Sequence, residues 1–372
     1  MNAPAAPRSE PAPAGEDLAI VLSGGGARAA YQVGVLRGMA KHLPDLRFPI
    51  ITGVSAGAIN AAYLASHAGC TAEAVVDLGE IWSRLQVEDI FQVDPPSLAG
   101  DLMRWAGWAA RLATGESLIG PDLRGFLDTE PLRRTIRRAS PTVDGEIVGI
   151  ESNLERGALR AVAITALNYM TGQSVTWVQG HSIAPSTQPQ RRHHSTRLTV
   201  EHVMASCSLP LLFPAVRVAG AWYGDGGVRL AAPLSPALRL GASRILAISP
   251  HYFPSHEEAD RPQIPGYPPI AQILSQLLDS VFLDVLDEDV RRLEGMNELI
   301  AKIPAAERGG YRPIDILVLR PSVDLGTLAV AYEPRLPDTF RLLARSLGSH
   351  EATTSDFLSM LMFQPDYLEQ LL

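Results

Sequence analysis

Short apolar runs and segments with a three-to-four-residue apolar repeat alternate along the first part of this chain. Residues 17–22 and 48–52 are largely apolar runs of strand length. Between them lies a segment whose apolar residues recur at helical spacing, namely Val33, Leu36, Ala40 and Leu43. The pattern predicts strands that alternate with helices.

The remaining apolar patterns continue this order toward the carboxyl end. Further strands are expected at residues 159–167, 174–178, 244–248 and 315–319, and a hairpin at residues 216–224 with its turn at Ala219-Gly220. Helices are expected at residues 71–85, 97–113, 269–303, 334–347 and 351–363, with a short one from residue 200, and residues 182–196 are expected to form a solvated loop. Alternation of this kind gives a largely parallel sheet covered on both faces, so we predict a three-layer α/β/α fold with a mostly parallel central sheet.

Composition narrows the function classes more than it narrows the fold. Of 372 residues, 46% are hydrophobic, which is enough for a large core, and the formal net charge of −8 argues against nucleic-acid binding. No apolar run reaches the roughly 18 residues of a transmembrane helix. Residues 1–16 are rich in proline and alanine and lack the apolar core of a signal peptide. We therefore expect a disordered tail at residues 1–16 and a cytoplasmic protein, and peripheral contact with a membrane stays open.

The pentapeptide Gly53-Val54-Ser55-Ala56-Gly57 follows the second apolar run and precedes a helical pattern. This context is typical of a nucleophile elbow, in which a sharp turn presents a serine hydroxyl at the amino terminus of a helix. Gly53 and Gly57 remove Cβ atoms that would clash in such a turn. The helix dipole favours negative charge that develops there. The motif predicts Ser55 as a nucleophile.

Three consecutive glycines, Gly24-Gly25-Gly26, follow the first apolar run and lie just before Arg28. Bare backbone N–H groups favour an anion, and in acyl transfer that anion is the tetrahedral oxyanion. The spacing also fits a dinucleotide-binding fingerprint, which needs an acidic residue about twenty positions on, at the end of the second strand. Asp45 has that spacing but precedes the second strand, so oxyanion binding is the favoured interpretation.

A third motif of small residues, Asp225-Gly226-Gly227, follows the predicted hairpin. A serine hydroxyl needs a base before it attacks a carbonyl carbon. A carboxylate serves as that base when loss of solvation raises its pKa. Asp225 is therefore the candidate base for Ser55. No cluster of histidine, cysteine, aspartate or glutamate has metal-ligand spacing, so no metal is expected.

The three motifs, in this order, resemble those of the patatin-like phospholipase family. Residues 205–210 and Phe213-Pro214 are similar to the family's segment before the aspartate motif, and Trp82 lies in the expected helix after the elbow. The resemblance covers about residues 17–250. Ala29 departs from the glycine that the family often has there, and residues 229–233 lack the family's frequent asparagine-proline pair.

The resemblance implies a serine lipid acyl hydrolase of the phospholipase A or esterase type, with a Ser–Asp dyad, an acyl-enzyme intermediate and no cofactor. Ser55 would be the nucleophile and Asp225 its base, while the backbone of Gly24, Gly25 and Gly26 would form the oxyanion hole. Supporting roles fall to Arg28, Gly53, Gly57, Gly226 and Gly227. Residues 17–250 would form the patatin-like catalytic domain. Residues 251–372 would form a mainly helical extension packed on it.

Two other functions stay open on the sequence alone. A Ser–Asp–His triad of the α/β-hydrolase type is compatible with the chain order, because His251 and His350 both follow Asp225. The fold is also compatible with a gated lipid-binding or signalling module whose site is closed.

The expected partner is a lipid or phospholipid substrate. Trp105 and Trp108, in the helix expected at residues 97–113, suit either a lipid headgroup layer or a core or dimer contact, and the second is favoured. The polar run Arg191-Arg192-His193-His194 is assigned to the solvated loop. The apolar stripe of residues 269–303 leaves a homo-oligomer open.

Overall fold

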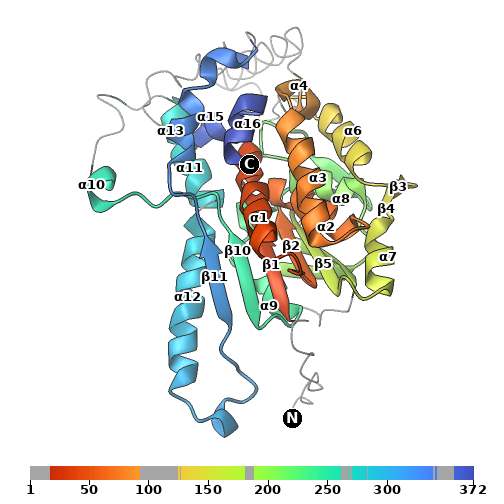
Figure 1. The fold of residues 1–372 in the computed structure, drawn as a ribbon, viewed down its shortest axis with the longest axis vertical. Coiled ribbons are helices and arrows are strands. Elements are labelled where there is room, and N and C mark those ends of the chain that lie inside the picture. Colours follow the sequence, from red (N-terminus) through yellow and green to blue (C-terminus); the bar gives the residue numbers. More distant parts are fainter. Residues whose placement is uncertain are drawn as a thin grey trace, which may run out of the picture.

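A nine-stranded sheet forms the centre of the fold (Figure 1). The computed structural model describes residues 17–92, 125, 127–180, 188–260, 267, 270–282, 284–337, 340–341 and 356–372. In sheet order the strands are β11 (Asp315–Leu319), β10 (Arg244–Ile248), β1 (Leu18–Leu22), β2 (Ile50–Val54), β5 (Ala161–Asn168), β6 (Ser174–Gly180) and β7 (Arg191–Ser195), while β8 (Val216–Val218) and β9 (Ala221–Asp225) join at β5.

The five neighbouring strands from β11 to β5 run parallel to one another. Strands β6 and β9 are antiparallel to β5, and β7 is parallel to β6. A separate hairpin pairs β3 (Thr142–Val143) with β4 (Glu146–Ile147). The carboxyl ends of β1 and β2 therefore lie at one edge of the sheet, which is where the segments that follow them meet.

The helices vary in length from one turn to five turns. They are α1 (Ala30–His42), α2 (Ala56–Ser66), α3 (Thr71–Arg84), α4 (Val87–Ile90), α6 (Glu130–Ala139), α7 (Gly149–Glu155), α8 (Val200–Ser206), α9 (Ser235–Arg239), α10 (His256–Ala259), α11 (Ile270–Phe282), α12 (Asp284–Ala301), α13 (Leu325–Val330), α15 (Asp356–Leu361) and α16 (Pro365–Leu371). Short 3-10 turns are η1 (Gly26–Ala29), η2 (Gly226–Arg229), η3 (Ala305–Glu307) and η4 (Glu333–Arg335).

Alternate residues of the central strands face two different helical layers. In β1, Ile20 and Leu22 belong to the core cluster that contains α1, α2 and α3. Ala19 and Val21 belong to a second cluster with residues of α9 and α12. Because the side chains of a strand point alternately to its two faces, the two clusters mark the two sides of the sheet. The predicted three-layer α/β/α fold with a mostly parallel sheet is confirmed.

The last described segment, residues 356–372, packs into the core rather than over it. Helix α15 contacts η1, and α16 contacts α1 and α3. The ring of Phe363 stacks on Trp82 with 6.3 Å between centroids, and Tyr367 has no exposed surface. The end of the chain therefore completes the helical layer that covers α1 and α3.

Several of the predicted elements occur as expected. The strands predicted at residues 244–248 and 315–319 coincide with β10 and β11. The predicted hairpin is β8 and β9, and its turn residues Ala219 and Gly220 have φ angles of 46° and 85°. Glycine adopts a positive φ readily, whereas the same φ is unfavourable for alanine. The two positive φ angles show that the chain reverses at these two residues.

Two predictions are wrong in detail. Residues 191–195 form the edge strand β7 instead of a loop, because their backbone pairs with β6 while their side chains remain largely exposed and polar. Leu43 is expected in the first helix, but α1 ends at His42 and Leu43 is 51% exposed. Val33 and Leu36 lie in this helix and are buried.

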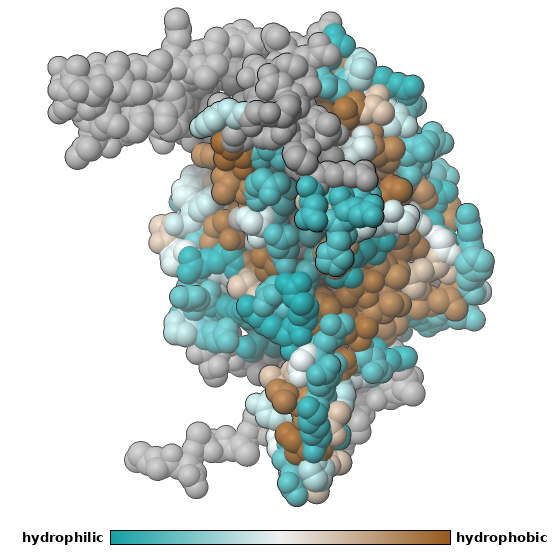
Figure 2. Space-filling model, turned by 90° about the vertical axis from the view of Figure 1, so that its left-hand side faces the viewer, coloured by the Kyte–Doolittle hydropathy of each residue, from teal (hydrophilic) through white to brown (hydrophobic). Residues whose placement is uncertain are grey.

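The apolar stripe of residues 269–303 is shared between α11 and α12, which flank residue 283. Phe282, Leu286 and Val290 are buried, whereas Leu277 and Leu299 are more than half exposed. On the side of the molecule that carries these helices and β11, hydrophobic patches lie among hydrophilic surface (Figure 2). The helix expected at residues 97–113, with Trp105 and Trp108, and most of the helix expected at residues 334–347 lie outside the described residues. The helix expected at residues 351–363 is described from Asp356 onward as α15.

Candidate active site

Strands β2 and β9 approach each other along the same side of β5. The last residue of β2, Val54, pairs with Thr165, and the next residue of β5, Ala166, pairs with Asp225 at the end of β9. Since β2 is parallel and β9 antiparallel to β5, their carboxyl ends point toward one another. This register brings Ser55, the residue after β2, next to Asp225.

Ser55 has the backbone geometry of a sharp strand-to-helix turn. Its φ is 54° and its ψ is −136°, a region that residues with a Cβ atom rarely adopt. The turn is held on both sides: the N–H of Ser55 donates to Ser206 Oγ at 3.0 Å, and the Cys207 thiol donates to the Ser55 carbonyl at 2.9 Å. Burial raises the pKa of the Cys207 thiol, so the thiol keeps the proton that this bond needs.

The glycines of the elbow are required by close backbone approaches. A Cβ atom at Gly53 would lie 2.5 Å from the carbonyl oxygen of Gly57. A Cβ atom at Gly57 would lie 2.3 Å from the carbonyl oxygen of Leu22, at the end of β1. Both distances are far below van der Waals contact, so any larger residue would displace the serine.

Asp225 is a carboxyl group with no exposed surface. Its Oδ1 accepts a hydrogen bond from the N–H of Gly227 at 2.9 Å, whereas Oδ2 has no hydrogen-bond partner of normal geometry among the described residues. Burial raises the pKa of Asp225 to about 7, although the nearby Ser55 hydroxyl and the Gly227 amide both act to lower it. A carboxyl group with this pKa is suited to exchange protons near neutral pH.

The two glycines after Asp225 let the chain turn away in a crowded space. A Cβ atom at Gly226 would lie 2.1 Å from the Thr165 carbonyl oxygen, and one at Gly227 would lie 2.4 Å from the Phe282 ring. The aspartate motif is therefore compressed between β5 on one side and α11 on the other.

The glycine loop lies directly against the Ser55 side chain. A Cβ atom at Gly24 would lie 2.9 Å from Ser55 Cβ and 3.4 Å from Ser55 Oγ. Gly25 and Gly26 have φ angles of 152° and 57°, so the loop uses conformations that favour glycine. Gly24 thus lies against Ser55, and Gly26 lines the same cavity as Ser55.

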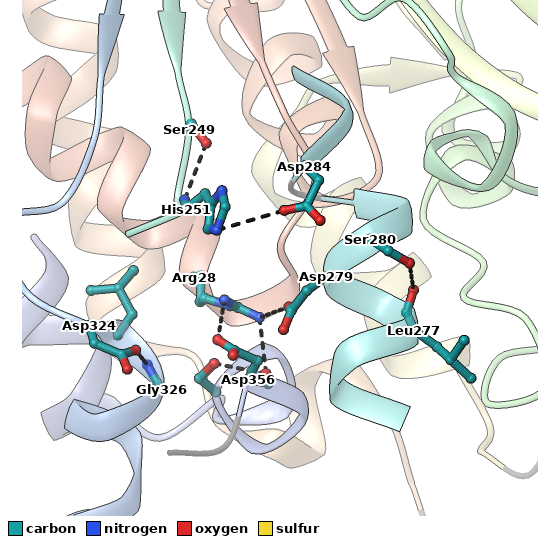
Figure 3. Close-up of polar contacts among 12 residues, drawn as sticks. Arg28, Ser249, His251, Leu277, Asp279, Ser280, Asp284, Asp324, Gly326 and Asp356 are labelled. Atoms are coloured by element: carbon teal, nitrogen blue, oxygen red, sulfur yellow. Dashed lines mark hydrogen bonds and ion pairs between the residues drawn. The ribbon is translucent and has the colours of Figure 1, made fainter. Parts of the chain in front are cut away.

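Arg28 points away from this loop toward the carboxyl-terminal helices (Figure 3). Its guanidinium is 2% exposed and donates to Asp356 Oδ1 at 2.8 Å and to the Asp356 carbonyl at 3.1 Å. Asp279 of α11 lies 3.6 Å away on the other side, and burial together with the charge of Asp356 raises its pKa. Sequence reasoning named Arg28 but gave no signal for either acidic partner, because both are distant in the chain.

Phe282 lies beside the site. A Cβ atom at Gly24 would lie 3.6 Å from its ring and one at Gly227 would lie 2.4 Å from it, and Phe282 is 6% exposed. The sequence pattern identified it only as one apolar position of a long helix. The tertiary structure places it beside the glycine loop and the aspartate motif at once.

An apolar cavity opens beside Ser55 and extends between α2, α3 and α6. None of its described lining residues is charged. The cavity therefore offers a hydrophobic surface that begins at the serine.

His251 and His350 are the candidates for the histidine of a Ser–Asp–His triad. His251 hydrogen-bonds with Asp287 Oδ2 at 2.7 Å, and its Nε2 lies 3.9 Å from Asp284 Oδ1. Asp287 also accepts from Arg320 Nε at 3.2 Å, so this histidine belongs to a hydrogen-bond network that joins the segments after β10 and β11 to α12. His350 lies outside the described residues. Within the described part of the chain, no histidine hydrogen-bonds to Ser55 or Asp225.

Neither a metal-binding cluster nor a membrane-spanning helix occurs among the described residues. Over this part of the chain, no group of three or more histidine, cysteine or acidic side chains could hold a metal ion. No described helix combines the length and the apolar character that crossing a bilayer requires.

Comparisons with known proteins agree with the motifs. The model of the family described as "Patatin-like phospholipase" matches residues 20–238. A comparison with curated protein sequences finds no match.

Solved structures that are similar to the chain include VipD from Legionella pneumophila, with 14% identity, 82% of this chain and 61% of that chain covered, and a TM-score of 0.32. Another is human GIVD cytosolic phospholipase A2 in complex with an inhibitor, methyl gamma-linolenyl fluorophosphonate, and terbium chloride, with 13% identity, coverages of 67% and 47%, and a TM-score of 0.34. A third is the type III effector protein ExoU, with 19% identity, coverages of 64% and 43%, and a TM-score of 0.28. The chain thus spans less than two thirds of the length of each.

Proposed function

The chain belongs to the patatin-like phospholipase family, and from this premise we propose that it is a serine lipid acyl hydrolase that cleaves fatty acyl esters, with phospholipids as the expected substrates. One observation carries the proposal: the register on β5 sets Ser55, in a strained elbow, beside the buried carboxyl of Asp225. Strain of this kind persists where the surrounding structure enforces it, and it is concentrated at functional sites.

In the proposed first half-reaction, Ser55 Oγ forms a bond to the ester carbonyl carbon while its proton passes to Asp225. The carbonyl oxygen becomes an oxyanion, which the backbone N–H groups of the Gly24-Gly25-Gly26 loop would stabilise. When the oxyanion collapses, the bond to the alcohol breaks and Asp225 returns the proton to that alcohol. The acyl group remains on Ser55 as an ester.

In the second half-reaction, Asp225 takes a proton from a water molecule that attacks this ester. The Ser55 oxygen leaves and recovers the proton from Asp225, and a fatty acid is released. The raised pKa of Asp225 supports both roles, since the group must accept and donate within one cycle near neutral pH. No metal or cofactor is needed for these steps.

Two substitutions test the proposal. Ser55→Ala removes the nucleophile and Asp225→Asn removes the base, so each is expected to lower ester hydrolysis by about a thousandfold or more. The measurement is fatty acid released from phospholipid vesicles and from soluble p-nitrophenyl esters. Asp225→Asn keeps an oxygen that can accept from Gly227, so its fold is expected to stay intact.

Matched controls are available on α3. Ser83→Ala and Asp77→Asn change the same residue types away from the cavity and are expected to retain full activity. A fluorophosphonate probe should label Ser55 in the wild-type protein and leave Ser55→Ala unlabelled. Retained turnover in Asp225→Asn would remove the dyad, and a loss after substitution of His251 or His350 would favour the triad.

The gated lipid-binding module is the second candidate. It is favoured by the Phe282 ring, which packs near both Gly24 and Gly227. A wild-type protein that binds lipid but resists the fluorophosphonate probe under all conditions would favour this module over the enzyme.

A further inference from the structure

The cavity beside Ser55 has a defined direction. Its α2 wall is formed by residues on one face of that helix, from Ala56 through Ile59 and Ala62 to Tyr63. Trp82 of α3 and Phe363 complete the opposite wall, and the indole N–H of Trp82 is satisfied by Asn60 Oδ1 at 2.8 Å. The cavity therefore runs along α2, away from the serine, with an apolar lining.

The far end of the cavity lies at the carboxyl end of α2. Ser66, the last residue of α2, lies with its hydroxyl oxygen 3.5 Å from that of Ser140, which follows α6. Ser140 and its neighbour Ala139 both line the cavity, as does Tyr63. Because Ser55 precedes the other end of α2, the residues at the end of α6 line the part of the cavity that lies farthest from the nucleophile along α2.

A single layer of side chains separates this end from the solvent. A groove on the outer surface, between α3 and α6, is lined by charged residues such as Asp77, Arg84 and Arg138. This groove and the inner cavity share five residues: Tyr63, Ile81, Leu85, Thr135 and Ala139. These five residues form a wall with the apolar cavity on one side and the charged groove on the other.

We propose that the cavity holds the acyl chain of the substrate and that this wall limits the preferred chain to a medium length, near ten carbons. The inference rests on the proposed acyl hydrolase function. Tyr63 of α2 lies eight residues after Ser55, which caps the start of this helix, and eight residues span about 12 Å along a helix. An extended acyl chain gains roughly 1.3 Å per carbon from bonds of about 1.5 Å, so about nine or ten carbons fill this depth.

Each methylene that enters the cavity is expected to raise kcat/KM about fourfold, since its burial removes apolar surface from water. The gain ends where the chain meets the wall. Longer chains must either bend back toward Ser55 or pass the wall into a groove lined by charged residues. Both alternatives favour medium chains over long ones.

Two substitutions in the wall are expected to shift the preference in opposite directions. Ala139→Leu adds three carbons at the end of the cavity and should lower the decanoyl-to-butyryl ratio of kcat/KM about tenfold. Leu85→Ala opens the wall and should raise the palmitoyl-to-decanoyl ratio about fivefold. Ala40→Leu is the matched control, because it makes the same change at another half-buried helix position, on α1, and should leave both ratios unchanged.

The measurement is kcat/KM for p-nitrophenyl butyrate, decanoate and palmitate with the wild-type protein and the three variants, after thermal unfolding has shown that each is folded. Binding of decanoic and butyric acid to the same proteins is measured by calorimetry. A wild-type preference for palmitate, or unchanged ratios and unchanged binding in both wall variants, would overturn the assignment. A third outcome separates the two proposals. If the protein hydrolyses no ester but binds decanoic acid, and Ala139→Leu weakens this binding, the cavity assignment stands and the hydrolase proposal fails.

Discussion

The fold stabilises the protonated carboxyl group of Asp225, whereas the proposed chemistry requires the deprotonated one. Burial raises the pKa of its carboxyl to about 7, so the folded protein binds a proton there more tightly than the unfolded chain does. Between pH 4 and pH 7, the unfolded state releases this proton first, and the free energy of unfolding falls as the pH rises. The charged form that a base requires is therefore the form that the fold disfavours, as expected at a functional site.

The same carboxyl group gives a pH dependence of activity. As the proposed base, Asp225 has to be deprotonated in the free protein, so kcat/KM is expected to rise about tenfold per pH unit below pH 7 and to level off above it. The profile is measured with a soluble p-nitrophenyl ester between pH 5 and pH 9. A profile that is flat across this range would contradict the assignment of Asp225 as the base.

At the scale of elements, Arg28 links three segments that are distant in the sequence. It lies in η1, immediately after the glycine loop, and pairs with Asp356 of α15 and with Asp279 of α11 (Figure 3). Its side chain is almost fully buried, and the carboxylate of Asp356 at 2.8 Å compensates part of the desolvation cost, while Asp279 lies 3.6 Å away. The conformation of the glycine loop is thereby coupled to the position of two carboxyl-terminal helices.

Removal of the Arg28 charge should destabilise the protein markedly. Arg28→Met leaves two acidic side chains without their shared cation and is expected to lower the free energy of unfolding by about 2–4 kcal/mol. The control is Arg84→Met, since the Arg84–Glu80 pair is mostly exposed and should contribute less than about 1 kcal/mol. Urea unfolding of the two variants at pH 7 measures the difference, and equal midpoints would contradict the coupling.

At the scale of the whole molecule, the end of the chain is part of the core. Met362, Tyr367 and Leu368 have no exposed surface, and Phe363 stacks on Trp82 of α3. Strand β11, also beyond residue 250, extends the parallel sheet beside β10. The residues after 250 thus supply both a strand and buried side chains to the structure that holds the elbow.

A truncation tests this dependence. A chain that stops after Ser349 lacks α15 and α16 and is expected to lose the cooperative thermal transition, because it exposes the apolar surface that these helices cover. The control Glu369→Ala changes an exposed position on α16 and should unfold like the full chain. A truncated protein that keeps the full-length transition temperature would show that residues 350–372 are dispensable.

The sequence by itself determined the parts of this protein that depend on local geometry. Gly53 and Gly57, at fixed spacing around Ser55 and between an apolar run and a helical pattern, mark the elbow from the sequence alone. The short apolar runs of β10 and β11 identify strands for a similar local reason, although only β10 is largely buried. These signals sufficed for the fold class and for the choice of Ser55 and Asp225 as candidates.

Only the tertiary structure decided which distant residues meet. The edge strand β7 reads as a polar loop because its backbone, not its side chains, makes the stabilising contacts. Likewise, Asp279, Phe282 and Asp356 carry no local signal, since their roles arise from helices packed onto η1 and the glycine loop. Short motifs specify the local geometry of the candidate site, whereas the contacts between distant residues depend on how the whole chain packs.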